Sequence, residues 1–135
     1  MRRVVVPLLL LVFATSSEAE PAPASAAEIA HLLDAVEASQ CTFIRNGAPH
    51  PSAEARAHME LKYDHVRRRV DTAEDFIELA GSQSSITGRP YLVECDDEPQ
   101  RRSRDWLLER LHAFRAAKGD GVAFLPFPRC SERIF

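Results

Sequence analysis

Two short segments rich in β-forming residues, 41–44 and 90–95, each contain a cysteine. A third cysteine, Cys130, lies near the C-terminus, so a single disulfide bond can form in three ways. A bond between the two segments would hold them side by side and fix the parts of the chain around them. Which cysteines pair therefore constrains the fold more than any other feature of the sequence.

An antiparallel pairing of the two segments gives a self-consistent register. With Cys41 opposite Cys95, Phe43 lies opposite Val93 on the same face, because side chains alternate along a strand. The next pair on that face is Arg45 opposite Tyr91, a cation beside an aromatic ring. This register favours the Cys41–Cys95 bond and leaves Cys130 as a free thiol. The other two bonds, and a bond through Cys130 between two chains, stay open as alternatives.

Helical periodicity surrounds the two segments. Apolar residues recur every three or four positions in four stretches, and a residue able to cap a helix stands before each. The expected helices span about residues 26–39, 53–69, 73–81 and 104–118, preceded by Ser25, Ser52, Thr72 and Ser103. Ser25 with Glu28 and Thr72 with Asp75 have the spacing of a capping box. The sequence therefore predicts a mainly α fold: about four helices and a short two-stranded antiparallel β element in a single domain held by one disulfide bond.

The N-terminus has the features of a secretory signal peptide. Two arginines precede an apolar run over residues 4–14, which is shorter than the roughly 18 residues of a membrane span. We expect residues 1–19 to be removed, with residue 24 as the second choice of cleavage site, and residues 20–24 to form a flexible leader. The expected location is periplasmic or secreted, with no transmembrane segment in the mature chain.

Composition narrows the domain organisation and the class of partner. The chain has 135 residues and a formal net charge of −3. This length fits one small domain, which we expect at residues 25–118, and this charge gives no basic field for a nucleic-acid backbone. Residues 119–135 include Pro126 and Pro128, which prevent a helix, so we expect an extended C-terminal tail.

One polar cluster interrupts the apolar pattern of the second expected helix. Lys62 falls on the same stripe as Met59, and His58 precedes Lys62 by one helical turn. A lysine on an apolar stripe either extends to the surface or meets partners that offset its desolvation. The proposed register also brings the turns beside the two β segments to the same end. The candidate ligand-binding residues there are Arg45, Asn46, His58, Lys62, Ser85 and Tyr91.

Metal binding has little support in the sequence. Glu54, His58 and His65 diverge around the second helix, and no other spacing matches a zinc signature. We therefore expect neither a metal nor a cofactor.

Several motifs occur in a recognisable order. They are Cys41-Thr42-Phe43-Ile44-Arg45-Asn46-Gly47, then Ala55, His58 and Lys62-Tyr63, then Thr72-Ala73-Glu74-Asp75-Phe76-Ile77, then Ser85 to Tyr91 with Cys95, and finally Trp106-Leu107. Over about residues 29–115 this order resembles the YfeK-like family of small exported bacterial proteins of unknown function. The resemblance implies export and the extent of the domain, and its pattern includes cysteines matching Cys41 and Cys95. The chain departs from it at Met59, where a leucine is usual, and in the extension after residue 118.

Three functions are compatible with these observations. The interpretation we favour is a non-catalytic binding or interaction module of the bacterial envelope, whose partner is an envelope protein or a small anionic ligand. An alternative is a small hydrolase-like enzyme with His58 as base, Lys62 lowering its pKa and Arg45 holding an anion. Ser84 or Ser85 would then be the nucleophile, although neither lies in a GxSxG motif. A disulfide-linked structural dimer is the third possibility.

Overall fold

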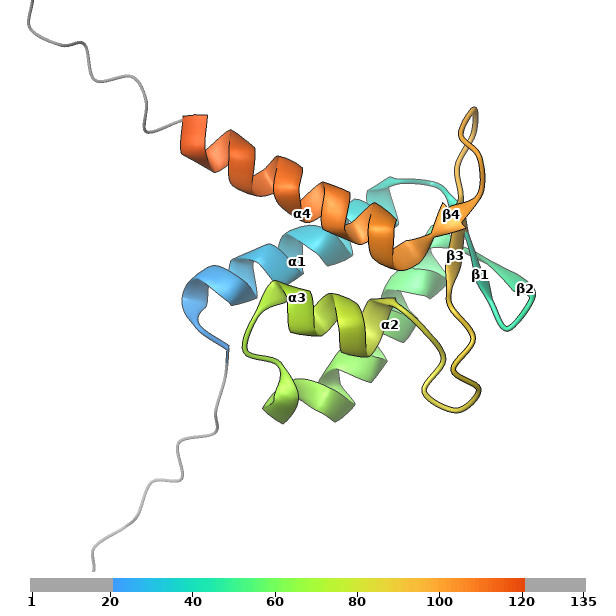
Figure 1. Ribbon diagram of the computed structural model, residues 1–135, viewed down its shortest axis with the longest axis horizontal. Helices are drawn as coiled ribbons and strands as arrows, with labels where there is room; N and C mark the ends of the chain where they lie inside the picture. The colour runs from blue at the N-terminus through green and yellow to red at the C-terminus, as the bar shows by residue number, and fades with distance from the viewer. Residues whose placement is uncertain (1–20, 121–135) are drawn as a thin grey trace, which may run out of the picture.

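A helical layer with a small antiparallel sheet at one end makes up the described part of the chain, residues 21–120 of the computed structural model (Figure 1). The helices are α1 (Pro23–Ala38), α2 (Ser52–Val66), α3 (Ala73–Phe76) and α4 (Ser103–Asp120), with a 3-10 turn η1 (Arg67–Arg69) after α2 and a π-helical turn η2 (Ile77–Gly81) continuing α3. Helix α1 packs against α2, α3 and α4. No helix within residues 21–120 is long and apolar enough to cross a membrane.

The beginning of α1 differs from the sequence prediction. Pro23 occupies the first helical turn, where its fixed φ angle and missing N–H are tolerated, so Ser25 lies inside the helix. The predicted cap at Ser25 is therefore wrong, and so is the placement of Pro23 in a flexible leader over residues 20–24. Glu28, the other half of the expected capping box, instead accepts hydrogen bonds from Arg115 of α4.

Two other predicted caps are also wrong. Ser52 is the first residue of α2, and its hydroxyl donates to the carbonyl oxygen of Glu37 in α1 at 3.1 Å. Ser103 is the first residue of α4, and its buried hydroxyl has no hydrogen-bond partner among the described residues. Its backbone N–H donates to the carbonyl oxygen of Tyr91 at 2.9 Å, which joins α4 to the sheet.

The third helix follows the prediction closely. The Thr72 hydroxyl accepts from the Asp75 N–H, and the Asp75 carboxylate accepts from the Thr72 N–H, so the capping box is confirmed. Phe76 and Ile77 are buried, as the apolar face of the helix requires. Gly81 ends the π-helical turn where a Cβ atom would lie 2.5 Å from Cδ1 of Leu107, so close packing against α4 requires the glycine.

The core lies between the helices and extends onto one face of the sheet. Its largest fully buried side chains include Trp106, Phe76 and Leu32. Trp106 meets Phe43 of the sheet edge to face, with ring centroids 5.9 Å apart. Tyr63, which the sequence analysis did not place in the core, packs edge to face on Phe76 at 5.5 Å.

The sheet has four strands, so the predicted two-stranded element is incomplete. The strands are β1 (Thr42–Arg45), β2 (Ala48–Pro51), β3 (Leu92–Glu94) and β4 (Arg101–Arg102), arranged in the order β2-β1-β3-β4 with every neighbour antiparallel. The predicted register between β1 and β3 is confirmed, because Phe43 lies opposite Val93. Between β1 and β2 the turn is made by Asn46 and Gly47, whose φ angles of 51° and 81° are those of a tight hairpin.

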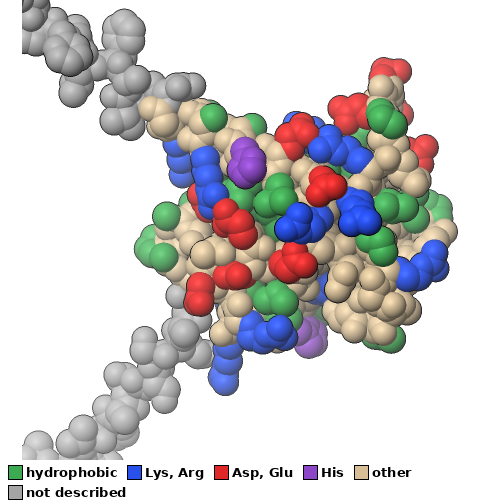
Figure 2. Space-filling model, viewed as in Figure 1, with side chains coloured by type: hydrophobic (Ala, Val, Ile, Leu, Met, Phe, Trp, Pro, Cys, Tyr) green, Lys and Arg blue, Asp and Glu red, His purple; other side chains and the backbone are tan. Residues whose placement is uncertain are grey.

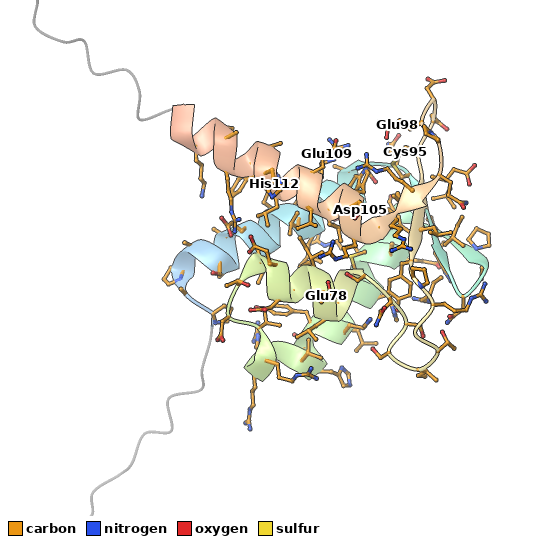
Figure 3. The ribbon with its side chains drawn as sticks, in the orientation of Figure 1. Glu78, Cys95, Glu98, Asp105, Glu109 and His112 are labelled. Atoms are coloured by element: carbon orange, nitrogen blue, oxygen red, sulfur yellow. A yellow bond between two sulfur atoms is a disulfide. The ribbon has the colours of Figure 1, made fainter. Side chains whose placement is uncertain are left out.

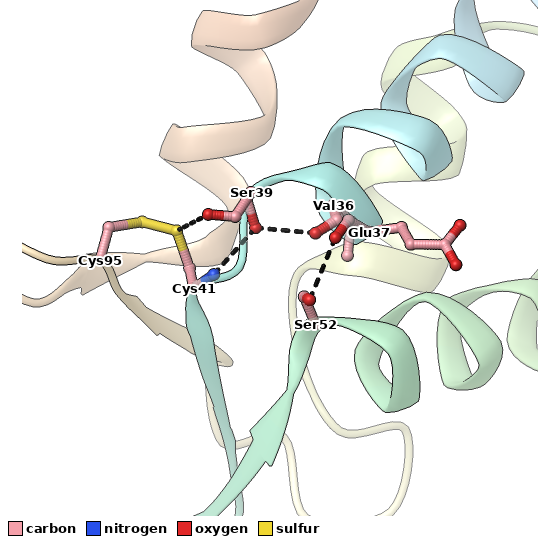
Figure 4. Close-up of a disulfide and its surroundings, with 6 residues drawn as sticks. All are labelled: Val36, Glu37, Ser39, Cys41, Ser52 and Cys95. Carbon is pink, nitrogen blue, oxygen red and sulfur yellow. Dashed lines mark hydrogen bonds between the residues drawn. A yellow bond between two sulfur atoms is a disulfide. The ribbon is translucent and has the colours of Figure 1, made fainter.

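The disulfide bond joins the start of β1 to the end of β3. Cys41 and Cys95 are bonded, which confirms the predicted pairing (Figure 4). Ser39, which follows α1, accepts from the N–H of Cys41 and donates to the carbonyl of Val36, so the end of α1 is tied to the same point. Cys130 lies outside the described residues, and both its free state and its bond to a second chain stay predictions. Non-reducing electrophoresis of the native protein beside Cys130→Ser would decide between them.

Candidate functional site

The candidate site forms where α2 faces the residues before β3. His58 and Lys62 are partly exposed on successive turns of α2, and both reach Tyr91, which is buried with 5% of its surface exposed. The His58 Nε2 atom lies 3.2 Å from the Tyr91 hydroxyl oxygen, and the Lys62 ammonium lies 3.4 Å from it. The ammonium also donates to the Gln83 carbonyl oxygen at 2.6 Å and lies 4.9 Å from the centre of the Tyr91 ring. The predicted proximity of His58, Lys62 and Tyr91 is therefore present.

The Tyr91 hydroxyl connects the two side chains. Lysine can only donate, so Lys62 gives a hydrogen bond to the Tyr91 oxygen. The tautomer of neutral His58 sets the direction of the second bond: a ring protonated on Nδ1 accepts from the phenol O–H, and a ring protonated on Nε2 donates to the phenol oxygen. In either tautomer Tyr91 orients the histidine ring.

Arg45 and His50 complete the edge of the cluster. The paired part of β1 and β3 ends at Ile44 and Leu92, and extending this register by one residue puts Arg45 opposite Tyr91. His50, opposite Phe43 on β2, lies on the same side of the sheet. They line a hollow of about 20 Å³ together with Phe43, Ile44, Ala55, His58, Met59 and Tyr91. This space holds about one water molecule, so only the end of a larger ligand can enter.

The surroundings of the cluster disfavour the protonated forms of His58 and Lys62. Burial, followed by the charges of Arg45, Lys62 and His50, lowers the pKa of His58 to about 4. Burial and then Arg45 also lower the pKa of the Lys62 ammonium, and burial raises the pKa of the Tyr91 phenol. His58 is therefore neutral near pH 7, and a negative charge placed here would reverse part of the penalty on its protonation.

Several cations elsewhere in the described chain are paired with carboxylates. On the face shown in Figure 3, Arg104 pairs with Glu78 and Asp105, and Arg101 pairs with Glu109. Figure 2 shows the same face, where blue and red side chains adjoin across α4 and its neighbours.

By contrast, Arg45, His58 and Lys62 have no carboxylate partner within residues 21–120. Glu54, one helical turn before His58 on α2, binds His50 at 3.0 Å. Two groups that can carry positive charge therefore meet at Tyr91, with Arg45 close enough to lower the pKa of both, and none of the three has a carboxylate partner in the described chain.

Two of the expected site residues do not join the cluster. Asn46 accepts a hydrogen bond from the Thr87 hydroxyl at 2.7 Å, so it connects the β1–β2 turn to the loop before β3. Ser85 lies on the other side of Lys62, in a groove along α2. Sequence reasoning missed His50 as a lining residue and Gln83 as the lysine's acceptor. The Asn46-Gly47 pair, a strong hairpin signal, would have predicted β2 and with it the position of His50.

The hydrolase-like arrangement receives no support from the contacts of the serines. His58 is bonded to Tyr91 and to no serine hydroxyl among the described residues. The Ser84 hydroxyl accepts a hydrogen bond from the N–H of Thr87 and stabilises the loop before β3.

No group of three His, Cys, Asp or Glu side chains within residues 21–120 is arranged to hold a metal ion. His65 bonds to the Leu61 carbonyl of its own helix.

Comparison with known proteins gives a family but no activity. The model of a family described as "Family of unknown function (DUF5329)" matches residues 23–115. A curated relative, "Uncharacterized protein YfeK" of Salmonella typhimurium strain LT2, is 38% identical over 92 residues, which cover 67% of this chain and 77% of the relative. No solved structure gives a significant match. The chain therefore belongs to this YfeK-like family of unknown function.

Proposed function

We propose that this protein is a non-catalytic binding module of the bacterial envelope that holds an anionic group of its ligand between Arg45, His58 and Lys62. The single observation that carries the proposal is the meeting of His58 and Lys62 at the Tyr91 hydroxyl, with Arg45 lining the same hollow as His58 and Tyr91, and without a carboxylate partner for any of the three in the described chain. A carboxylate or phosphate group fits this set of donors because it accepts charge-assisted hydrogen bonds.

The size of the hollow favours binding over catalysis. Space for about one water molecule admits an oxygen atom of an anion, while the rest of the ligand stays on the surface. A hydrolase of the kind considered would need a nucleophile within hydrogen-bond reach of the base, and no serine hydroxyl of the described chain bonds to His58. The neighbours of His58 provide a phenol, an ammonium and a guanidinium, which are groups that bind a charge.

Export is part of the proposal. The N-terminal residues have the order of a signal peptide, and a disulfide bond is typical of proteins that fold in an oxidising compartment. Mass spectrometry of the protein recovered from the periplasm or medium would test this part, with a mature chain that begins at Glu20 as the expected result. A chain that retains residues 1–19 inside the cell would contradict it.

Anion binding is tested by thermal unfolding with and without inorganic phosphate, at an ionic strength held constant with sodium chloride. A ligand that binds the folded protein alone stabilises it by about 2.7 kcal/mol at one hundred times its Kd. We expect phosphate to raise the Tm of the native protein, and Arg45→Ala and Lys62→Met to lose this rise while still folding. Arg102→Ala, which removes an exposed arginine outside the cluster, is the matched control. An equal rise in all four proteins would refute the site.

A further inference from the structure

The groove on the far side of Lys62 extends the surface beyond the anion cluster. It has a volume of about 410 Å³ and is lined by Leu61, Lys62, His65, Val66, Arg69 and Ser85. Its apolar floor comes from α2, and its polar wall comes from η1 and the loop before β3. Lys62 belongs to both this groove and the cluster at Tyr91, so the two form one continuous strip along α2.

Two unusually exposed apolar side chains mark this strip. Among the described residues the large hydrophobic side chains that stand open to solvent are Leu61, 57% exposed, and Ile86, 96% exposed. Leu61 lines the groove, and Ile86 is the next residue in the chain after Ser85, which also lines it. The loop that carries Ile86 is built by its own hydrogen bonds, since the Gly88 N–H donates to the Ser84 carbonyl at 2.9 Å. Because hydrogen bonds hold the loop in shape, the exposed isoleucine side chain provides apolar surface that a partner can bury.

The charges around the strip define the partner. Arg45, Lys62, Arg69 and Arg89 form no ion pair within residues 21–120, although the whole chain is acidic with a net charge of −3. Arg89 lies beside the β1–β2 turn, because its guanidinium is 3.9 Å from the Cβ position of Gly47. A ligand that covers this strip must therefore combine negative charge with apolar side chains.

We propose that the strip binds an acidic segment of another polypeptide, with a carboxylate at the Arg45, His58 and Lys62 cluster, an apolar side chain in the groove at Leu61, and further apolar contact with Ile86 on the adjoining loop. This inference rests on the proposed function and gives its ligand a class. A groove with an apolar floor can accommodate a side chain of a peptide. The flat surface of a bilayer would not fill such a groove.

The experiment measures the fluorescence anisotropy of labelled decapeptides with the full mature protein. The first peptide alternates Glu and Leu, the second alternates Gln and Leu, and the third alternates Glu and Ser. We expect the Glu–Leu peptide to bind, and each of the other two to bind at least about tenfold more weakly, because each lacks one of the two interactions. Absence of binding by the Glu–Leu peptide, or equal binding by all three, would overturn the inference.

Variants then locate the binding surface. Leu61→Ser with Ile86→Ser should weaken binding of the Glu–Leu peptide about tenfold, since both side chains are exposed and their loss leaves the core intact. Arg69→Glu should weaken it as well, whereas Arg102→Glu, an equal charge change outside the groove, should not. Peptide binding unaffected by the Leu61 and Ile86 changes would place the ligand elsewhere and refute the inference.

Two further measurements separate the possible failures. If phosphate still raises the Tm through Arg45 and Lys62 but the Glu–Leu peptide does not bind, the anion site stands and the polypeptide assignment fails. If phosphate has no effect either, the proposed function fails too. Co-flotation with phosphatidylglycerol vesicles that depends on Ile86, without peptide binding, would assign the strip to a membrane surface and overturn the inference.

Discussion

At the scale of single residues, His58 makes stability depend on pH. Its pKa is about 4 in the folded protein and 6.5 in an unperturbed histidine, so between these values the unfolded chain binds a proton that the folded chain does not. The free energy of unfolding should therefore fall as the pH drops from about 6.5 to about 4. Urea unfolding across this range should show a smaller fall in His58→Asn than in the native protein. His112→Asn, on the exposed face of α4, is the control, and a fall in His58→Asn as steep as in the native protein would contradict the assignment.

Two glycines of the described chain predict opposite effects of adding a methyl group. At Gly81 the new Cβ would lie 2.5 Å from Leu107, which is fully buried, so Gly81→Ala should destabilise the protein by about 1–3 kcal/mol. At Gly119, in α4, no atom lies within 4 Å of the new Cβ, and Gly119→Ala should stabilise the helix by about 0.5–1 kcal/mol. Urea unfolding measures both, and a Gly81→Ala protein as stable as the native one would show that α4 can move away from η2.

At the scale of elements, the start of a helix is predictable from sequence where a side chain caps it. It is not predictable where a proline or tertiary packing determines the first residue. Thr72 and Asp75 form a capping box, whereas Ser25 and Glu28, at the same spacing, lie inside α1. Thr72→Ala should thus cost about 1 kcal/mol of unfolding free energy. Ser25→Ala should change it by less than about 0.5 kcal/mol, because alanine suits a helix interior. Equal losses in the two variants would mean that the sequence pattern alone determines the cap.

The missed strands have physical reasons too. In β2, Pro49 and Pro51 remove two backbone hydrogen-bond donors. The sequence therefore predicts an extended chain here but no paired strand. The strand forms as an edge of the sheet, which is where proline is tolerated. β4 consists of Arg101 and Arg102, too short to show any alternation. By contrast, the segments of β1 and β3 carry apolar residues at alternate positions on a buried face, and this alternation predicts their register.

At the scale of the whole molecule, one covalent bond and one arginine hold distant segments together. Cys41 and Cys95 are 54 positions apart, and closing a loop of this length stabilises a fold by about 4 kcal/mol in the chain-entropy account. Arg115 binds Glu28 of α1 and Glu74 of α3, so α4 is bonded to both. In a Cys130→Ser background, reduction of the disulfide bond should lower the urea-unfolding free energy by about 4 kcal/mol. An unchanged midpoint would contradict this role.

The candidate site was predictable in part for the same reason as the sheet. Helix spacing predicts that His58 lies beside Lys62, and the strand register predicts that Arg45 lies opposite Tyr91, because both rest on fixed periods. The contact of Tyr91 with His58 and Lys62 depends on how α2 packs on the sheet. Gln83 binds Lys62 through its backbone carbonyl, and a backbone contact leaves no trace in side-chain identity. His50 depended on the hairpin strand that was not predicted.

The central claim, that Arg45, His58 and Lys62 together hold an anion, is tested most directly by the pKa of His58. The His58 ring can be titrated by NMR with and without sulfate, which stays doubly charged across the range, at an ionic strength held constant with sodium chloride. Without sulfate we expect a pKa of about 4. With sulfate the pKa of His58 should rise toward its ordinary value of 6.5, because a bound anion favours the imidazolium. A His58 pKa that sulfate leaves unchanged would contradict the account.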